Sequence, residues 1–423
     1  MATQRYDIVI FGASGFTGQF VVEEVARIAD EEPGLTWAIA GRTMSKMQKV
    51  LEQASKKTGK ELDSTPVLIA DTTNETSMVE MCKQAKVILN CVGPYRFHGE
   101  MMVKAAIEGG ASHLDISGEP QFLETMQLKY HNQAKKNGVY IIGACGFDSI
   151  PAEMGVVFIS RQFKGEVNSV ESYFEILSGP EGYALHMGTL DSAIHVVAHP
   201  LELRSVNRSL YPEHLPPSKH RVSERSAVFK SEVVGKYCLP FLGSDKSVVY
   251  RTQRYKHDVL KQRPIQFVPY LVKDGLVSVV GNILFGLLFL IMSSFGLGRT
   301  LLMKFPSFFT AGFFKKGGPT KTQIENSSFK MTFVAKGWSK TLEDPLSDPQ
   351  EKPDTILTAK VAGPEIGYIT TPICMVQSAL VVLKEADKLP KDGGVYPPGA
   401  AFLNTSLIER LNKHNITFTE VKD

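Results

Sequence analysis

The sequence YDIVIFGASGFTG, at residues 6–18, joins a short apolar run to a glycine-rich turn. Gly12, Gly15 and Gly18 follow the spacing G-x-x-G-x-x-G, one residue longer than the commonest dinucleotide-binding fingerprint. Glycines at such a turn let the backbone approach a pyrophosphate, whose charge then faces the amide groups at the start of the following helix. A plain strand-to-helix turn is the alternative, but the position between an apolar run and an amphipathic stretch favours a dinucleotide-binding loop.

Beyond this loop, short apolar runs alternate with longer amphipathic stretches up to about residue 150. Such alternation predicts an α/β fold, in which helices cover both faces of a parallel sheet. Strands joined by helical crossovers form a Rossmann-type, doubly wound sheet, whose ligands bind at the carboxyl ends of the strands. The six predicted strands are Tyr6 to Phe11, Leu35 to Ala40, Pro66 to Ala70, Lys86 to Cys91, Ser112 to Ile116 and Val139 to Ala144.

Three charged residues after the second and third predicted strands bear on the choice of cofactor. Arg42 stands where an enzyme that uses NAD(H) usually has an acidic residue for the ribose hydroxyls. Its planar guanidinium matches a 2′-phosphate, and Lys46 follows one helical turn later. We therefore predict NADP(H) as the cofactor, with Arg42 as a plain surface residue as the alternative. Asp71 is expected either beside the adenine or in an exposed turn.

The turn after the fourth predicted strand, Val92 to Tyr95, is expected to lie beside the nicotinamide ring. Gly93 would allow close approach of the backbone, and Pro94 would stiffen the turn. Tyr95 and His98 are the nearest side chains that can donate a proton once hydride has been transferred. Each has a structural alternative, Tyr95 as a packed ring with a hydrogen-bonded hydroxyl and His98 as a helix cap.

Composition narrows the class of protein further. The 423 residues are 43% hydrophobic and have a net charge of +3, which suits two or three globular domains. The five cysteines form no C-x-x-C pair and no secretory signal is visible, so we expect an intracellular, reducing compartment and no metal site. Between Arg204 and Lys340, 22 Lys and Arg outnumber 7 Asp and Glu. This surplus carries no recognition motif, and we expect no nucleic-acid partner.

The uncharged segment Gly275 to Gly298 is interpreted as the chain's only membrane-length stretch. Lys and Arg lie on both of its flanks, which suits a segment that enters one leaflet and leaves on the same side. We therefore favour attachment to a membrane or lipid monolayer, on the cytosolic face of the endoplasmic reticulum or on a lipid droplet. Mitochondrial association stays open. A buried helix, an oligomer interface and a transmembrane span are the alternatives for the segment.

Several motifs together resemble the saccharopine dehydrogenase family. They are GASGFTG (Gly12 to Gly18), AGR (Ala40 to Arg42), NCVGPY (Asn90 to Tyr95), HLDISGE (His113 to Glu119) and CGFDSIPAEMG (Cys145 to Gly155). The resemblance implies an NADP-binding domain at 1–150, a second α/β domain at 151–360 that carries the apolar segment 275–298, and a C-terminal segment at 361–423 that returns to the first domain. It also implies that the cofactor is surrounded by Gly12, Ser14, Gly15, Phe16, Thr17, Gly18, Arg42, Val92, Gly93, Pro94 and Tyr95.

These observations predict an NADP(H)-dependent oxidoreductase that transfers hydride to or from an apolar, lipid-like substrate at a lipid surface. Tyr95 is the first candidate proton donor, followed by His98, Asp115 and Asp148. The first alternative is a non-catalytic NADP(H)-binding scaffold or sensor, which would have the same fold. An open apolar cleft from Tyr95 toward residues 275–314 would favour the enzyme.

The second alternative is an amino-acid dehydrogenase of the saccharopine type. Saccharopine carries several carboxylates, so its site would need fixed arginines in the second domain. No arginine of this sequence can be matched to such a role, which disfavours an amino-acid substrate. A homodimer is a further expectation, implied by related enzymes.

Overall fold

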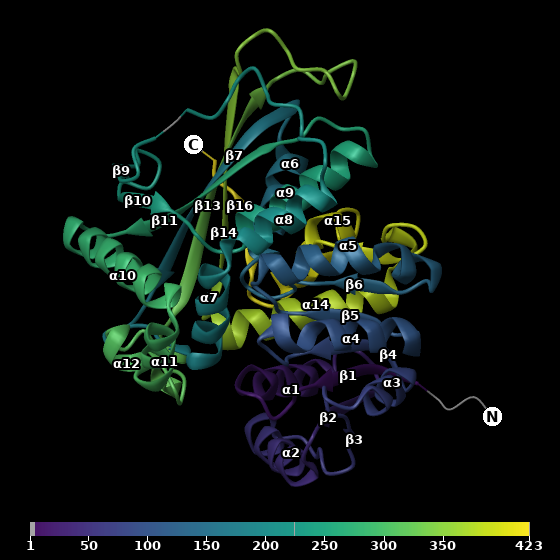
Figure 1. Cartoon of the computed structure of the whole chain (residues 1–423). Coiled ribbons are helices and arrows are strands. Elements are labelled where there is room, and N and C mark those ends of the chain that lie inside the picture. The colour runs from purple at the N-terminus through teal and green to yellow at the C-terminus, as the bar shows by residue number, and fades with distance from the viewer. Residues whose placement is uncertain (1–4, 224, 423) are drawn as a thin grey trace.

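The computed structural model describes residues 5–223 and 225–422. Within these ranges the strands form two sheets of seven strands and a small sheet of two. The first large sheet lies at the lower right of Figure 1 and the second rises at the upper left, so the chain folds into two α/β parts. The predicted fold class is confirmed.

The first sheet is parallel throughout, with the order β15-β6-β5-β4-β1-β2-β3. All six strands predicted from the N-terminal sequence are present, with ends displaced by at most two residues. Helices cover both faces, which explains why most of these strands are rich in apolar residues. The strands are β1 (Tyr6–Phe11), β2 (Trp37–Gly41), β3 (Val67–Ile69), β4 (Ala85–Asn90), β5 (Ser112–Asp115), β6 (Tyr140–Ile142) and β15 (Gly394–Tyr396).

The crossover helices of the first sheet follow the predicted alternation. They are α1 (Phe16–Ile28), α2 (Met44–Thr58), α3 (Glu75–Lys83), α4 (Tyr95–Gly109) and α5 (Pro120–Lys136). At the ends of α2 and α4, Gly59 and Gly110 adopt positive φ angles of 71° and 68°, the left-handed conformation that commonly closes a helix.

A helix from the far end of the chain also covers the first sheet. Helix α14 (Thr371–Lys384) packs on β4, β5 and α1, and it continues the π-helical turn η1 (Ile366–Thr370). Together they form a second helix that is long and apolar enough to span a membrane. In this helix 83% of the most apolar 18-residue stretch is buried inside the protein. The prediction of a single membrane-length stretch was therefore wrong. The reason is that a helix enclosed on all sides by the core is as apolar as a membrane span.

The second sheet has the order β16-β14-β13-β7-β11-β10-β9 and is antiparallel except where β7 pairs with β11. Helix α6 (Ile150–Gln162) packs on β13 and β14 and connects the two sheets along the chain. The strands are β7 (Glu166–Leu177), β9 (Phe229–Lys230), β10 (Tyr237–Pro240), β11 (Gln266–Lys273), β13 (Ser328–Trp338), β14 (Thr355–Pro364) and β16 (Thr417–Glu420).

The C-terminal segment divides between the two sheets. Residue 360, the predicted domain boundary, falls inside β14. After α14, strand β15 joins the first sheet beside β6, whereas β16 pairs with β14 in the second sheet. Strand β16 therefore lies outside the first sheet and covers the edge of β14.

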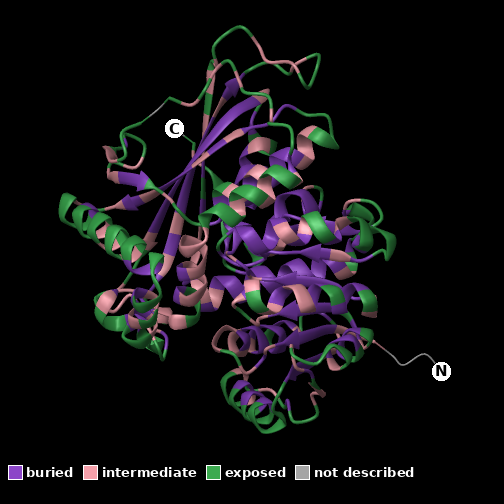
Figure 2. Cartoon of the chain, viewed as in Figure 1, coloured by how far each residue is buried: buried purple, intermediate pink, exposed green. Residues whose placement is uncertain are grey.

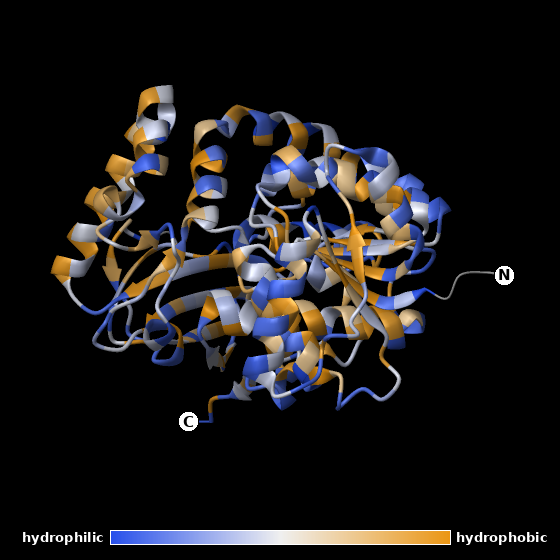
Figure 3. Ribbon diagram, turned by 90° about the horizontal axis from the view of Figure 1, so that it is seen from below, coloured by the Kyte–Doolittle hydropathy of each residue, from blue (hydrophilic) through white to orange (hydrophobic). Residues whose placement is uncertain are grey.

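The apolar segment forms a helix at the outer edge of the second part. Helix α10 (Leu276–Ser294) packs at one side on α7 (Met187–Ala198) and α11 (Gly296–Lys304), where Leu190, Ile194, Met292 and Leu302 form a small core. Most of α10 is exposed, as its green surface in Figure 2 shows. Figure 3 colours this outlying helical region largely as hydrophobic.

The remaining short elements complete the second part and the C-terminal segment. They are β8 (Leu185–His186), α8 (Pro200–Leu210), α9 (Asp245–Asp258), α12 (Pro306–Phe309), β12 (Phe314–Lys315), α13 (Lys321–Glu325), the 3-10 turn η2 (Ala386–Lys388), α15 (Pro398–Ala401) and α16 (Leu407–Lys413).

Candidate active site

The glycine-rich loop lies between β1 and α1, at the carboxyl edge of the first sheet. Gly12 has a φ angle of +81°, and a Cβ atom there would lie 2.6 Å from Val92 Cγ2. A Cβ atom at Gly18 would lie 2.2 Å from the carbonyl oxygen of Gly12. Both positions therefore require glycine, because a side chain at Gly12 would push the loop away from the turn that follows β4, and one at Gly18 would push α1 away from the loop.

The start of α1 fits the pyrophosphate of a dinucleotide. Gly15 is the N-cap residue, no side chain caps the helix, and the first turn carries no acidic residue. The first amide groups are thus free to donate to an anion at the positive end of the helix. Gly15 is exposed, and Ser14 and Thr17 are half-buried, so the loop is accessible from solvent. When bound, NADP(H) would supply the hydride at this edge of the sheet.

Arg42 and Lys46 are exposed at the end of β2 and the start of α2. Asp71 lies across from them after β3, where its Oδ1 accepts hydrogen bonds from the amide and the hydroxyl of Thr73, both at 2.9 Å. These hydrogen bonds lower the pKa of Asp71. Asp71 therefore holds its own turn, while Arg42 keeps its donors available for a 2′-phosphate.

We expect Arg42→Ala to remove the preference for NADPH over NADH. Charge-assisted hydrogen bonds to a phosphate contribute about 1.5–3 kcal/mol, so NADPH affinity should fall by about tenfold to a hundredfold while NADH affinity stays unchanged. Equilibrium titration of both nucleotides measures the difference. Lys49→Ala, another exposed cation on α2, is the matched control. Equal affinities of the wild-type chain for both nucleotides would contradict the role of Arg42.

Tyr95, the first candidate proton donor, is fully engaged by the main chain. Its hydroxyl donates to the carbonyl of Asn90 at 2.9 Å and accepts from the amide of Ile116 at 3.3 Å. The side chain is 6% exposed, and burial raises its pKa well above the ordinary value. The geometry therefore matches the structural alternative for Tyr95, a packed ring that fixes the ends of β4 and β5.

His98 and Asp115 also hold local structure. His98 Nδ1 lies 3.4 Å from the hydroxyl of Thr72, on the side of the Asp71 turn. Asp115 is 1% exposed and accepts from the amides of Ser117 and Ala144, at 2.9 and 3.0 Å. Burial raises the pKa of Asp115 to about 7. Its hydrogen bonds join the ends of β5 and β6.

Asp148, after β6, is the candidate whose side chain is exposed. It lies against the backbone of Gly118, where a Cβ atom would be 2.6 Å from Asp148 Oδ2. The surrounding protein nevertheless disfavours its charged form and raises its pKa. An accessible carboxylic acid with a raised pKa, at the carboxyl edge of the sheet, is suited to donate a proton.

A second carboxyl group, which the sequence did not single out, is influenced by the charge of Asp148. Asp245 begins α9 and is 3% exposed, and its Oδ1 has no hydrogen-bond partner among the described residues. Burial, followed by the charges of Asp148 and Glu153, raises the pKa of Asp245 well above its ordinary value. Two neighbouring carboxyl groups do not readily carry negative charge at the same time, so the charge of Asp148 disfavours a charge on Asp245.

Aromatic side chains from later parts of the chain, which sequence reasoning also missed, pack on Phe16 of the cofactor loop. The ring of His186 stacks on Phe16 with centroids 4.5 Å apart and an interplanar angle of 7°. Tyr368 meets Phe16 edge-on at 4.9 Å, and its hydroxyl accepts from the amide of His186 at 2.7 Å. No local motif marks His186 or Tyr368, because they reach Phe16 only through the packing of the two sheets.

Glu119 connects the cofactor edge to α7. Its carboxylate accepts from the amides of Tyr95 and Arg96, both at 2.9 Å, and so caps the start of α4. The same carboxylate accepts from the hydroxyl of Ser192 at 2.6 Å. The negative charge thus compensates the positive end of α4 and fixes α7 beside the 92–95 turn.

Comparison with known proteins places this site in a family. The family model described as the saccharopine dehydrogenase NADP binding domain matches residues 8–142. Saccharopine dehydrogenase-like oxidoreductase of Homo sapiens is 48% identical, over 100% of this chain and 99% of that protein. The chain belongs to the saccharopine dehydrogenase family. It is an oxidoreductase with an NADP(H)-binding domain, which confirms the predicted cofactor.

Two further family comparisons bear on the fold and the cellular setting. The lipid droplet localized protein of Caenorhabditis elegans is 40% identical, over 98% of both chains. The apo structure of saccharopine dehydrogenase (L-Glu forming) from Saccharomyces cerevisiae superimposes with a TM-score of 0.55 and 13% identity, over 98% of this chain and 99% of that chain. This structural likeness supports the arrangement of the two sheets.

Proposed function

We propose that the chain is an NADP(H)-dependent oxidoreductase that transfers hydride to or from a C=C or C=O bond of an apolar, lipid-like substrate while it rests on a lipid surface. One observation carries the lipid part of the proposal. Helix α10 exposes its apolar side chains to solvent. Only 17% of its most apolar 18-residue stretch is buried inside the protein. Large exposed apolar patches mark binding surfaces, and this one lies on the same chain as a cofactor site.

The position of α10 favours a monotopic anchor over a transmembrane span. Strand β11 precedes α10 and strand β13 follows it, and both pair with β7 in one sheet. A single crossing would place these two strands on opposite sides of a bilayer, which their shared neighbour does not permit. Lys273 before the helix and Arg299 and Lys304 after it would meet lipid headgroups on the same side.

The chemistry that we propose divides between the cofactor and Asp148. In the reductive direction hydride would add to one atom of the double bond, and the proton on Asp148 would go to the other atom. In the oxidative direction the carboxylate would accept that proton. The packed rings of Phe16, His186 and Tyr368 would exclude water from the loop side of the site.

The exposed apolar face of α10 also bears on where in the cell the chain acts. The name of the C. elegans relative places that protein on lipid droplets, which supports a droplet or endoplasmic-reticulum surface for this chain. Such a surface would give the enzyme direct access to a substrate that is poorly soluble in water. Fractionation of cells that express the full chain distinguishes droplets and reticulum from mitochondria.

A lipid-extract turnover assay tests the proposed function. Purified chain with NADPH should oxidise the nucleotide when an organic extract of membranes or droplets is added, and mass spectrometry should find a substrate that has gained two hydrogens. Saccharopine with NADP(+), or α-aminoadipate semialdehyde, glutamate and NADPH, serves as the polar comparison. Turnover of these amino acids but of no lipid would make the chain an amino-acid dehydrogenase, and nucleotide binding without any turnover would favour the scaffold.

A further inference from the structure

A cavity of about 840 Å³ lies where the second part meets α5 of the first part, away from the cofactor loop. It is enclosed by α5, α8, the loop at 214–221, the first half of α9 and the start of β11. Its size falls in the range of about 300–1,000 Å³ that is usual for small-molecule sites. It is lined neither by Tyr95 nor by residues 275–314, where the sequence suggested a cleft.

The inner wall of this cavity is apolar. Ile265 and Phe267, from the start of β11, are 7% and 9% exposed and form part of the lining. Phe241 also lines it and packs on Phe174 of the core, with ring centroids 5.5 Å apart. Leu242 stands at the opening and is 93% exposed. A hydrocarbon chain that filled the cavity would remove this apolar surface from water.

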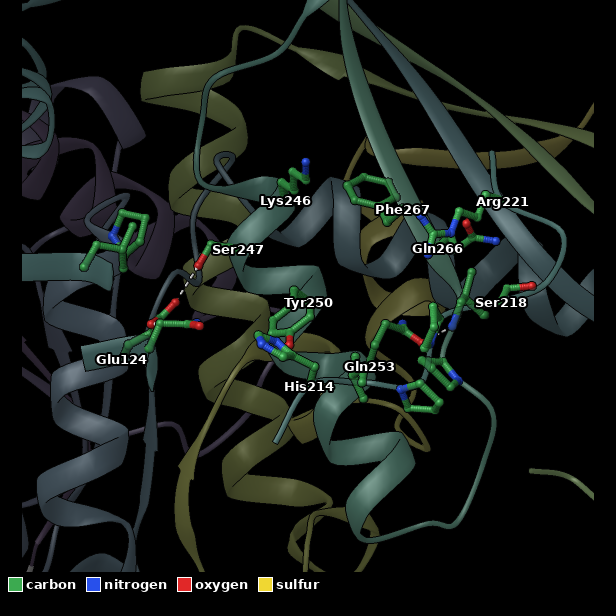
Figure 4. Close-up of a pocket in the computed structure, with 18 of the residues that line it drawn as sticks. Glu124, His214, Ser218, Arg221, Lys246, Ser247, Tyr250, Gln253, Gln266 and Phe267 are labelled. Atoms are coloured by element: carbon green, nitrogen blue, oxygen red, sulfur yellow. Dashed lines mark hydrogen bonds between the residues drawn. The ribbon is translucent and has the colours of Figure 1, made fainter. Parts of the chain in front are cut away.

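The outer lining of the cavity is cationic. Arg204, Arg208, Arg221 and Lys246 are exposed there, and no carboxylate of residues 5–223 and 225–422 lies within ion-pair distance of them. Arg263, in contrast, is buried and paired with Asp348 at 3.3 Å. Figure 4 shows Phe267 between Lys246 and Arg221, so apolar and cationic groups are neighbours on one side of the cavity.

The acidic residue Glu124 does not offset these cations. It is buried at the other end of the view, where its carboxylate accepts from Ser247 at 3.0 Å and from Asn207 at 3.3 Å. Burial raises the pKa of Glu124, which favours its neutral form. The exposed charge around the opening is therefore predominantly positive.

Two residues in the lining of the cavity are direct chain neighbours of residues at the candidate active site. Pro120 in its lining directly follows Glu119, which caps α4 beside the 92–95 turn. Gly243 in its lining precedes Ser244, whose hydroxyl donates to the main-chain carbonyl of Asp148 at 3.2 Å. A ligand in the cavity would thus lie next to the residues that shape the redox site.

From these features we infer that the cavity binds a single-chain lipid with an anionic head, its hydrocarbon chain on the apolar wall and its carboxylate or phosphate among Arg204, Arg208, Arg221 and Lys246. Charge attraction selects the head, and burial of the chain supplies the affinity. The inference deepens the proposed function and rests on it for the identity of the substrate. It names an anionic, single-chain amphiphile as the substrate class.

The test is a titration of the full-length chain with a fluorescently labelled palmitate, without nucleotide. The double variant Arg204→Glu/Arg208→Glu should bind the probe about tenfold more weakly, since each exposed ion pair contributes up to about 1 kcal/mol. The matched control Lys164→Glu/Lys391→Glu reverses two exposed charges elsewhere and should bind as the wild type does. Leu203→Trp, which fills the cavity, should abolish saturable binding.

Competition defines the ligand class. Palmitate and a lysophosphatidic acid should both displace the probe, palmitate methyl ester should do so poorly, and saccharopine should have no effect. Comparing how strongly palmitate and the lysophosphatidic acid displace the probe shows whether the cavity prefers a carboxylate or a phosphate head. Displacement by saccharopine, equal displacement by the ester, or undiminished binding to Leu203→Trp would each overturn the inference.

NADPH binding and lipid-dependent turnover of the same variants separate this inference from the proposed function. Probe binding that is lost while lipid turnover continues would refute the cavity as the substrate site only. Saturable probe binding by the wild-type chain, lost in Leu203→Trp but accompanied by no lipid turnover in the wild type, would refute the oxidoreductase proposal only. Unchanged NADPH affinity in Arg204→Glu/Arg208→Glu and Leu203→Trp shows that the variants are folded.

Discussion

Replacing Val277, Leu284 and Ile291 by aspartate should release the chain from lipid surfaces. These residues are 89%, 62% and 59% exposed and are spaced seven apart along α10. Each apolar side chain contributes about 1.5–3 kcal/mol when it is buried, so losing three should reduce partitioning by more than about a thousandfold. Flotation of purified protein with liposomes or isolated droplets measures the effect.

The α10 variant should keep its fold, because none of the three side chains is buried in the chain. Its melting temperature and NADPH affinity are therefore expected to match the wild type. Aspartates at Leu177, Val259 and Ile356, which are exposed apolar residues outside α10, form the control and should still float. Wild-type-like flotation of the α10 variant would refute the anchor. If the wild-type chain is a dimer that binds no lipid, and the α10 variant is a monomer, α10 is a dimer interface instead.

Changing Asp148 to asparagine should lower kcat for lipid reduction by about a hundredfold, since general acids contribute roughly 10² to 10⁴. NADPH affinity should remain unchanged. The surroundings of Asp148 raise its pKa, so its acid form persists to higher pH than for an ordinary aspartate. Wild-type kcat for reduction should therefore be high at low pH and fall as the pH rises through this raised pKa. The rate profile of Asp148→Asn should lack that fall.

Two comparisons sharpen the test of Asp148. Asp71→Asn alters a carboxylate that only holds its own turn, and it should leave kcat unchanged. Tyr95→Phe removes a hydroxyl that is bound by the main chain, so it should lower the melting temperature more than kcat. A large loss of kcat in Tyr95→Phe, with little loss in Asp148→Asn, would make Tyr95 the proton donor.

The nucleotide-binding half could be predicted because its signals are local. The strand β1, the glycines of the loop and the start of α1 are consecutive, and each restricts the backbone of its immediate neighbours. Arg42 could be recognised for the same reason, since it directly follows β2. Burial of the parallel strands on both faces made them readable as apolar runs.

The proton donor and the side chains that cover the cofactor loop could not be predicted in the same way. Asp245 approaches Asp148, and His186 covers Phe16, across separations of about 100 and 170 residues in the sequence. Tyr95 has the residue type of a proton donor, but only the packed structure shows that its hydroxyl is taken by the ends of β4 and β5. Whether a polar group is free or engaged depends on partners that the local sequence does not specify.

The two apolar helices show this division most directly. Their windows have mean hydropathies of 2.3 for α10 and 1.7 for the helix at Ile366–Lys384, so the sequence determined that both avoid water. Only the tertiary structure decided that the second packs against β4, β5 and α1, while α10 keeps its apolar face outside. Hydrophobicity specifies transfer out of water but not the destination, which depends on whether the rest of the fold provides a surface to cover the helix.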